Sequence, residues 1–388
     1  MSFLRAARAA LVGKKCLSRW STVIGLVVLA LFLPSCGSKS VPAFGQHQNA
    51  YITLPSQGSV LLVQINSITG EITTVAQTPQ TVGVSPQGLA IINKFLYVAN
   101  SSANTISLFN IASDGTLSQN ATPTPAGSGP TGVMVDPSGG YLLVTNSFSN
   151  NISVFSIDSS SGALTEVDGS PFYANQDPGE ILMPPSGDLV YVTNTGVGTV
   201  TGFTFSTSTG QLTSVGAPYY SGAGAAGMAV DSTGTHLYVA NTSAVNNPPT
   251  SVGNISGFNI NQTQGASYGT LTAISGSPFT AIAGSGPTNL VASGNFIFAT
   301  TPGGSYSVWV FTVNAMTGQL TATVNSPFSV ASGNLFALID ASGGFFYIGS
   351  PTGIQAYTYN QNNGEPQVID NSPFGTGGTS PGKMVISP

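Results

Sequence analysis

The chain has 388 residues, of which 41% are hydrophobic and only 5% are charged, with 48 glycines, 25 prolines and a formal net charge of −5 at pH 7. This composition favours short strands joined by tight turns over helices with charged, solvated faces. Five of the eight basic residues lie within the first nineteen positions, and no arginine follows Arg19. Because nucleic acids are bound by clustered basic side chains, the composition excludes a nucleic-acid partner.

The N-terminal segment has the order of an export signal. Basic residues lead into "VIGLVVLALFL" (23–33), an apolar run too short for a permanent membrane span. The next segment, "LPSCGS" (33–38), resembles a bacterial lipobox, which implies a signal peptide of residues 1–35, a lipid on Cys36 and a tether of residues 36–49. The alternative is a plain secretory signal with an incidental cysteine. Since the other cysteine, Cys16, lies in the signal peptide, no disulfide is expected.

The expected location follows from that segment. An exported protein held in the cell envelope by lipid contacts the membrane through its anchor only. Gly37, rather than Asp, follows the cysteine. In a Gram-negative cell this sequence would indicate the outer membrane or the periplasm.

A repeated unit fills the rest of the chain. A four-residue signature recurs seven times, as YITL at Tyr51, YVAN at Tyr97, LVTN at Leu143, YVTN at Tyr191, YVAN at Tyr238, FATT at Phe298 and YIGS at Tyr347. The signature lies in the second strand of each unit. A third β-rich segment follows it, and then a fourth that begins with G-x-L or a similar sequence. Together with the run before each signature, this makes four strands per unit. The pattern predicts an all-β fold, a seven-bladed β-propeller of four-stranded antiparallel blades, over residues 50–388.

The two ends of the repeat region predict how the ring closes. The first unit starts at its second strand, and the chain ends on an additional first strand, "SPGKMVISP" (380–388), which aligns with "GPTGVMVDP" (129–137). The C-terminal strand should therefore complete the N-terminal blade, so that neither end leaves an unpaired strand edge.

Ser-Pro-Phe segments mark the end of several units, with their prolines at Pro171, Pro278, Pro327 and Pro373 and a variant, "GAPYYS", at Gly216. Proline cannot donate to a strand ladder and belongs at or beyond an edge strand, while phenylalanine can pack between neighbouring blades. We interpret these segments as structural.

No motif in the sequence indicates a cofactor or a metal. "GSGPTG" at Gly127 and "GAGAAG" at Gly222 match a nucleotide-loop pattern, but both lead into a β-strand, so we expect turns between blades. Calcium-loop and Cys/His zinc spacings do not occur.

The repeat motifs carry a resemblance to a known family. The YVTN and YVAN signatures, the "DPSG" turn at Asp136 and the G-x-L-T segments resemble the YVTN-type propellers of the 6-phosphogluconolactonase-like lactonase family, over nearly all of residues 50–388. The resemblance implies a seven-bladed propeller and ring-opening hydrolysis of a sugar lactone at one end of the central channel. It also associates His, Glu and Arg with the channel of active members.

This chain lacks most of those groups. Beyond the signal peptide it has no arginine and two histidines. His47 is expected in the tether. His236 occupies a position where other units carry Tyr141, Leu189 or Phe345, which favours a packed side chain over a catalytic one.

The residues expected to face the channel lie at the start of the first strand of each unit. Aligned on Gly132 of "PTG", they are Gly88, Glu180, Gly227, Asn289, Phe336 and Lys383. Glu180, Asn289, Phe336 and Lys383 are the candidates for ligand binding. Glu180 and Lys383 are also candidates for catalysis, as a base and an electrophile. The alternative for this pair is a solvated or salt-bridged rim without a functional role.

Two functions remain open from the sequence. The missing arginine and the lack of a well-placed histidine favour a monomeric, non-catalytic propeller that binds a small molecule, a glycan or an envelope protein at its channel face. The fifth unit, with long segments at Thr242 and Asn261, could add to that face. The alternative, which the family resemblance implies, is a lactonase that uses Glu180 and Lys383.

Overall fold

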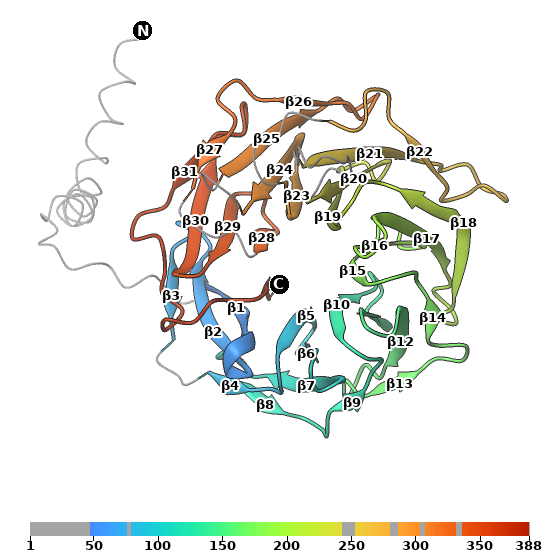
Figure 1. Ribbon diagram of the computed structural model, residues 1–388. Coiled ribbons are helices and arrows are strands. Elements are labelled where there is room, and N and C mark those ends of the chain that lie inside the picture. Colours follow the sequence, from blue (N-terminus) through green and yellow to red (C-terminus); the bar gives the residue numbers. More distant parts are fainter. Residues whose placement is uncertain are drawn as a thin grey trace, which may run out of the picture. The chain divides into compact units, whose positions relative to one another are not determined.

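A computed structural model describes residues 47–75, 79–242, 253–279, 286–302, 307–330 and 336–387. Within these residues, seven antiparallel sheets stand as blades around a central channel (Figure 1), which confirms the predicted propeller. The predicted signal peptide, Cys36 and residues 243–252 of the fifth unit lie outside the described residues. In the part of the chain that is described, no helix is long and apolar enough to cross a membrane.

The blades share one topology, in which four strands follow one another outward from the channel. Blade 1 contains β32 (Met384–Ile386), β1 (His47–Leu54), β2 (Ser59–Asn66) and β3 (Ile72–Thr74), with the 3-10 helix η2 (Pro55–Gln57) after β1 and β4 (Gln80–Thr81) beside β2. Blade 2 contains β5 (Pro86–Ile92), β6 (Phe95–Asn100), β7 (Thr105–Ile111) and β8 (Leu117–Gln119), with β9 (Thr124–Pro125) beside β7. Blade 3 contains β10 (Pro130–Val135), β11 (Tyr141–Asn146), β12 (Asn151–Ile157) and β13 (Leu164–Glu166), with β14 (Phe172–Tyr173) beside β12. Blade 4 contains β15 (Pro178–Leu182), β16 (Leu189–Asn194), β17 (Thr199–Phe205) and β18 (Leu212–Tyr220).

The remaining three blades continue the same order. Blade 5 contains β19 (Ala225–Val230), β20 (His236–Asn241), β21 (Asn254–Ile260) and β22 (Leu271–Ala273). Blade 6 contains β23 (Asn289–Ser293), β24 (Phe296–Thr301), β25 (Ser307–Val313) and β26 (Leu320–Ala322), with β27 (Phe328–Ser329) beside β25. Blade 7 contains β28 (Phe336–Ile339), β29 (Phe345–Ser350), β30 (Gly353–Tyr359) and β31 (Pro366–Val368).

The ring closes as the sequence predicts. β32 pairs antiparallel with β1, with Tyr51 opposite Val385. Figure 1 shows the C-terminus at the centre of the ring beside β1. β1 begins at His47, three residues before the predicted start of the propeller, and His47 pairs with Asn66. His47 therefore lies in the first blade and not in a tether, because β2 extends far enough to pair with it.

The hydrophobic core is divided among the spaces between blades. Within the described residues, seven apolar clusters each combine residues from two neighbouring blades. Alternate strand residues face opposite sides of a blade, so each blade contributes to two clusters. The described residues contain no cysteine, so no disulfide supports this part of the chain, and the apolar packing is its main source of stability.

The first residue of the signature connects neighbouring blades. In five blades it is a fully buried tyrosine whose hydroxyl donates to the carbonyl of the glycine in the next blade's G-x-L or G-x-I segment. These pairs are Tyr51–Gly115, Tyr97–Gly162, Tyr191–Gly269, Tyr238–Gly318 and Tyr347–Gly70. In blades 3 and 6 the position is Leu143 and Phe298, which have no hydroxyl to donate. The signature therefore holds most of the blade interfaces together.

The Ser-Pro-Phe segments are structural, as predicted. Phe172 packs against the cluster between blades 3 and 4, and the equivalent Phe279, Phe328 and Phe374 pack in the same way against theirs. The serine has a role that the sequence did not reveal. The Ser170 hydroxyl accepts the backbone N–H of Val154 in the third strand at 3.0 Å, and Ser277, Ser326 and Ser372 do the same in their blades. In blade 4 the variant segment instead continues as a nine-residue strand, β18.

Candidate functional site

The first strand of blade 4 presents Glu180 to the channel through an irregularity in its pairing. The register shifts between Pro178 and Ile181, so that Gly179 and Glu180 form a bulge. Bulges redirect a side chain and leave a backbone group without its ladder partner. Here the buried hydroxyl of Thr193 accepts the N–H of Glu180 at 3.0 Å, which satisfies that group and fixes the bulge.

Lys383 reaches the channel from the C-terminal segment, directly before β32. Its N–H donates to the buried hydroxyl of Thr53 at 2.8 Å, and its carbonyl accepts the N–H of Thr53 at 2.9 Å. The segment that closes the ring therefore also positions this lysine.

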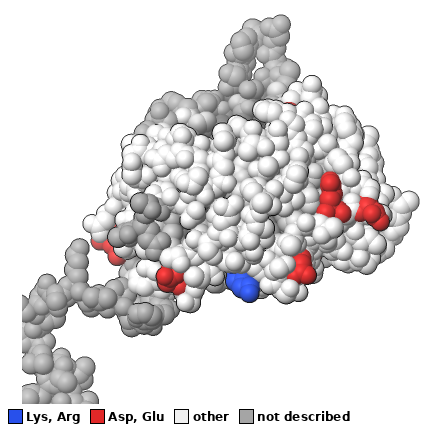
Figure 2. Space-filling view, turned by 90° about the horizontal axis from the view of Figure 1, so that it is seen from below, with Lys and Arg blue, Asp and Glu red and all other residues white. Residues whose placement is uncertain are grey.

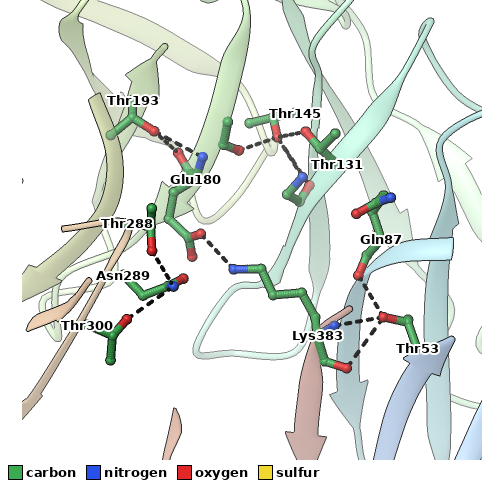
Figure 3. Close-up of polar contacts among 12 residues, drawn as sticks. Thr53, Gln87, Thr131, Thr145, Glu180, Thr193, Thr288, Asn289, Thr300 and Lys383 are labelled. Carbon is green, nitrogen blue, oxygen red and sulfur yellow. Dashed lines mark hydrogen bonds and ion pairs between the residues drawn. The ribbon is translucent and has the colours of Figure 1, made fainter. Parts of the chain in front are cut away.

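Glu180 and Lys383 meet across the channel, as Figure 3 shows. Lys383 Nζ lies 3.3 Å from Glu180 Oε2, and the two side chains are 44% and 39% exposed. The residues are 203 positions apart in the sequence, and the alignment of the repeats predicts only that both face the channel. Because ion pairs with this much exposure contribute little to stability, folding alone does not account for a pair in a chain with so few charges.

Asn289 completes the polar group. Its Nδ2 donates to Thr288 Oγ1 at 3.1 Å and to Thr300 Oγ1 at 3.3 Å (Figure 3). Both bonds use the amide nitrogen, which leaves Oδ1 as an acceptor for a ligand hydroxyl. Asn289 also lines both cavities of the channel, in agreement with its predicted place.

Phe336 does not share this environment, in contrast to its predicted role as a ligand contact. It is 1% exposed and belongs to the apolar cluster between blades 7 and 1. The reason is Gly349, the third residue of the blade 7 signature, because any side chain there would overlap the ring of Phe336. The ring folds back over its own blade and fills that space.

The channel contains two adjoining cavities of about 370 Å³ and about 240 Å³. Both are lined by Glu180, Gly227, Asn289 and Lys383. The larger one continues along the apolar first strands of blades 4 to 7, and the smaller one adds the hydroxyls of Thr131 and Thr195. A pocket of this size with a few convergent polar groups suits a small polar ligand.

Glycine at the equivalent positions keeps neighbouring first strands close together. A methyl group on Gly132 would lie 2.5 Å from the carbonyl oxygen of Gly179, and one on Gly227 would lie 2.7 Å from the Cα of Asn289. Side chains on these two blades would push the strands apart. The chemistry of the pocket is therefore concentrated on blades 1, 4 and 6.

His236 is a packed residue, as predicted. It is 5% exposed, and its Nδ1 lies 2.9 Å from Asp231 Oδ2. Burial alone would raise the pKa of Asp231, but hydrogen bonds from Thr233, His236 and Thr235 outweigh that effect and hold the pKa below its usual value. The Asp231 carboxylate also accepts the backbone N–H groups of its own turn, which identifies it as a turn-stabilising residue.

Charged side chains are also sparse outside the channel. Figure 2 shows a side of the molecule on which a few charged residues interrupt a largely uncharged surface. Over the described ranges, no group of three or more His, Cys, Asp and Glu side chains could hold a metal ion.

The site contains one kind of residue that the sequence prediction missed, the threonine at the third position of the signature, called here the signature threonine. It is Thr53, Thr145, Thr193 or Thr300, each fully buried. In the sequence these residues look like part of a strand motif. The sequence did hold one signal for them. The third residue of the signature is Thr, Ala or Gly, and every blade whose channel-facing residue is Lys, Glu or Asn has Thr there.

Comparisons with known proteins support the fold and its family. The model of a family described as "Lactonase, 7-bladed beta-propeller" matches residues 42–176 and 167–266, more than half of the chain. A 6-phosphogluconolactonase of Bacillus subtilis is 27% identical over 142 residues, which are 34% of this chain and 41% of that protein. A 6-phosphogluconolactonase of Formosa agariphila is 39% identical over 87 residues, 22% of this chain and 23% of that protein. The matches thus span less than half of either relative.

Solved structures show the same architecture. A periplasmic gluconolactonase of Pseudomonas aeruginosa superimposes with a TM-score of 0.69 at 15% identity, over 88% of this chain and 99% of that chain. A Lactobacillus plantarum protein has a TM-score of 0.71 at 15% identity, over 88% of this chain and 100% of that chain. At such low identity these likenesses show the fold alone.

Proposed function

This chain belongs to the seven-bladed lactonase propeller family, and from that premise we propose that it is a hydrolase that opens a sugar lactone in the channel. The observation that carries the proposal is the 3.3 Å approach of Lys383 Nζ to Glu180 Oε2 in a pocket of ligand size. Lactone hydrolysis needs a base for water and a cation or donor for the oxyanion, and these two side chains supply both.

The contact between Lys383 and Glu180 leaves hydrogen-bonding capacity on both side chains for water and substrate. An ammonium has three N–H donors and a carboxylate has two oxygens, so one contact leaves capacity on both sides. Both side chains are also partly exposed, so that water and substrate can reach them. A lactone whose carbonyl oxygen lies beside Lys383 would place its carbonyl carbon within reach of a water held by Glu180.

The reaction then proceeds in two proton-balanced steps. Glu180 accepts a proton from water as the water oxygen bonds to the carbonyl carbon, and the ammonium of Lys383 stabilises the resulting oxyanion. When the oxyanion collapses, the bond from the carbonyl carbon to the ring oxygen breaks, and protonated Glu180 returns its proton to that oxygen. The product is an open-chain hydroxy acid that ionises and releases one proton to solvent.

The non-catalytic interpretation has less support. It depended on the lack of arginine and of a placed histidine. The pair of Glu180 and Lys383 supplies an acid–base group and a cation without either residue type. The curated relatives are both named 6-phosphogluconolactonase, which favours catalysis over scaffolding.

The test is the rate of acid release from glucono-δ-lactone, measured in a pH-stat above the spontaneous rate. We expect Glu180→Gln to lower the enzymatic rate at least about 100-fold, the usual lower limit for removing a general base. Glu365→Gln, at a half-buried residue that lines neither channel cavity, is the control and should keep the wild-type rate. A wild-type rate equal to the spontaneous one, or an unaffected Glu180→Gln variant, would contradict the proposal.

We also propose that the hydrolase acts outside the cytoplasm, held by a lipid on Cys36. The lipobox-like segment "LPSCGS" supports this placement. Growth with a labelled fatty acid should label the wild-type protein but not Cys36→Ser. Equal labelling of both proteins, or of neither, would refute the lipid anchor.

A further inference from the structure

The charges of the channel cancel. Among the residues that line the two cavities, Glu180 and Lys383 are the charged ones, and they face each other. A phosphorylated ligand brings a dianion, which proteins bind with several cationic side chains or with unpaired backbone N–H groups. The single cation here is already compensated by a carboxylate.

Nothing else in the described chain adds cationic charge to the pocket. The other lysine of the described residues, Lys94, lies between β5 and β6, at the opposite end of β5 from the pocket residue Gln87. Its ammonium lies 5.4 Å from the centre of the Phe95 ring. From residue 47 to residue 387 the sequence holds two lysines and thirteen acidic residues, a formal balance of −11. The field of the protein therefore repels anions.

Among the described residues, four backbone N–H groups at the pocket are already used within the protein. The N–H groups of Gly132, Glu180 and Lys383 donate to the signature threonines. The N–H of Gly227 donates to the carbonyl of Thr288 in the next blade. Four backbone donors that could have formed a phosphate cradle are thus used within the protein.

From these observations we infer that the pocket takes an uncharged, hydroxyl-rich lactone and discriminates against the same lactone carrying a phosphate. The inference rests on the proposed function and names its substrate class. Sugar hydroxyls can donate to the oxygens of Glu180 and Asn289 and accept from Lys383, so the polar groups present suit a neutral ligand. Glu180 is the residue that disfavours phosphate, since its charge cancels that of Lys383 and leaves no net positive charge for a second anion.

Binding measured without turnover tests this inference. The probes are δ-gluconolactam, a ring amide that takes the place of the lactone, and the 6-phosphate of the same lactam. By calorimetry we expect the wild-type protein to bind the uncharged lactam at least about tenfold more tightly, because the pocket would partly desolvate the phosphate dianion without a net positive charge to pair with it. Equal affinities, tighter binding of the phosphate, or no binding of either probe would overturn the inference.

One substitution identifies the cause of the preference. Glu180→Gln keeps the shape of the side chain and leaves Lys383 uncompensated, so the preference should shrink about tenfold toward the phosphorylated probe. Glu365→Gln changes the net charge equally and should leave the preference as in wild type. A preference that Glu180→Gln does not alter would overturn the role of Glu180.

Turnover separates this inference from the proposed function. If neither gluconolactone nor its 6-phosphate is hydrolysed while the uncharged lactam binds with the stated preference, the proposed hydrolysis fails and the ligand class stands. If the phosphorylated lactone is hydrolysed with the higher kcat/KM, hydrolysis stands and the inference on the ligand fails.

Discussion

Four blades carry a signature threonine and three do not, and the two groups present different residues to the channel. The blades with threonine present Lys383, Gly132, Glu180 and Asn289, next to Thr53, Thr145, Thr193 and Thr300. The blades without it carry Ala99, Ala240 or Gly349 and present Gly88, Gly227 and Phe336. At this aligned position, the three polar side chains, Lys383, Glu180 and Asn289, therefore all belong to the first group.

The difference has a physical cause at the start of each first strand. Where the strand leaves regular pairing, a backbone N–H loses its partner, and a buried hydroxyl can replace it. Thr193 does this for Glu180, and Thr53 does it for Lys383. In blade 5, where Ala240 offers no hydroxyl, the N–H of Gly227 turns to the next blade instead. The comparison shows how a ring of similar blades can carry an asymmetric site: within one blade, the signature residue and the channel-facing residue change together.

The largest expected effect comes from removing the segment that joins ring closure to the site. A protein truncated after Thr379 loses Lys383, the pairing of β32 with β1 and the buried side chain of Met384. Three backbone pairs and one buried methionine together predict a loss of roughly 5 kcal/mol in unfolding free energy. Chemical denaturation would measure it.

Lys383→Met separates the two roles of that segment. It keeps the strand and the aliphatic part of the side chain, so we expect wild-type stability and a loss of lactone turnover of at least about 100-fold. A truncated protein as stable as wild type would show that the last strand does not close the ring.

The signature threonines allow a sharper test. Thr193→Val leaves the N–H of Glu180 without its acceptor, which should cost about 1–3 kcal/mol of stability and release the bulge that aims the carboxylate. We expect kcat to fall about tenfold with KM little changed, because a positioned base acts mainly on the chemical step. Initial rates over a range of gluconolactone concentrations would separate the two constants.

Thr201→Val is the matched control for that variant. Thr201 is buried in the same blade, donates its hydroxyl to the carbonyl of Ala174 at 2.7 Å and lines neither channel cavity. Both variants should lose similar stability, while only Thr193→Val should lose kcat. Thr193→Ser, which keeps the hydroxyl, should restore most of it. An equal loss of kcat in both valine variants would mean that the threonines act on stability alone.

The fold could be predicted well from the sequence because the same strand and turn pattern occurs seven times. Tyr191 and its equivalents identify the second strand of each blade, and the glycine whose carbonyl accepts each hydroxyl introduces the fourth strand of the next blade. The C-terminal segment aligns with the first strand of an internal unit, which predicted how the ring closes. The site was predicted in part. Repeat alignment placed Glu180, Lys383 and Asn289 in one channel, because equivalent positions in a ring face one axis.

Other parts of the site depended on contacts that alignment does not contain. Phe336 occupies an equivalent position, yet its ring is buried because Gly349 opposite leaves room for it. Thr193 reads as one more β-branched strand residue, and only the bulge in β15 reveals what its hydroxyl does. Predicting either required the pairing of each position with its cross-strand neighbour.

The smallest effect concerns the tyrosines at the first position of the signature. They occur in blades with and without a signature threonine, so replacing them should change stability in both groups alike. Burial is the main cause that raises the pKa of Tyr51, Tyr97, Tyr191, Tyr238 and Tyr347 above the ordinary 10.0. In the unfolded chain these tyrosines lose their protons near pH 10, whereas in the folded protein they keep them. Unfolding then releases protons, so the contribution of these tyrosines to stability should be constant below pH 10 and fall as the pH rises above it.

Tyr238→Phe tests both aspects of this contact. Loss of the bond to Gly318 should lower the unfolding free energy by about 1 kcal/mol at pH 7, and loss of one titrating group should make the decline above pH 10 less steep. Tyr220→Phe, at a tyrosine 62% exposed, should change neither quantity. Urea denaturation between pH 8 and pH 11 measures both. If the decline above pH 10 were as steep in Tyr238→Phe as in wild type, the alkaline sensitivity would have to arise elsewhere, and the tyrosine would contribute only its hydrogen bond across the blade interface.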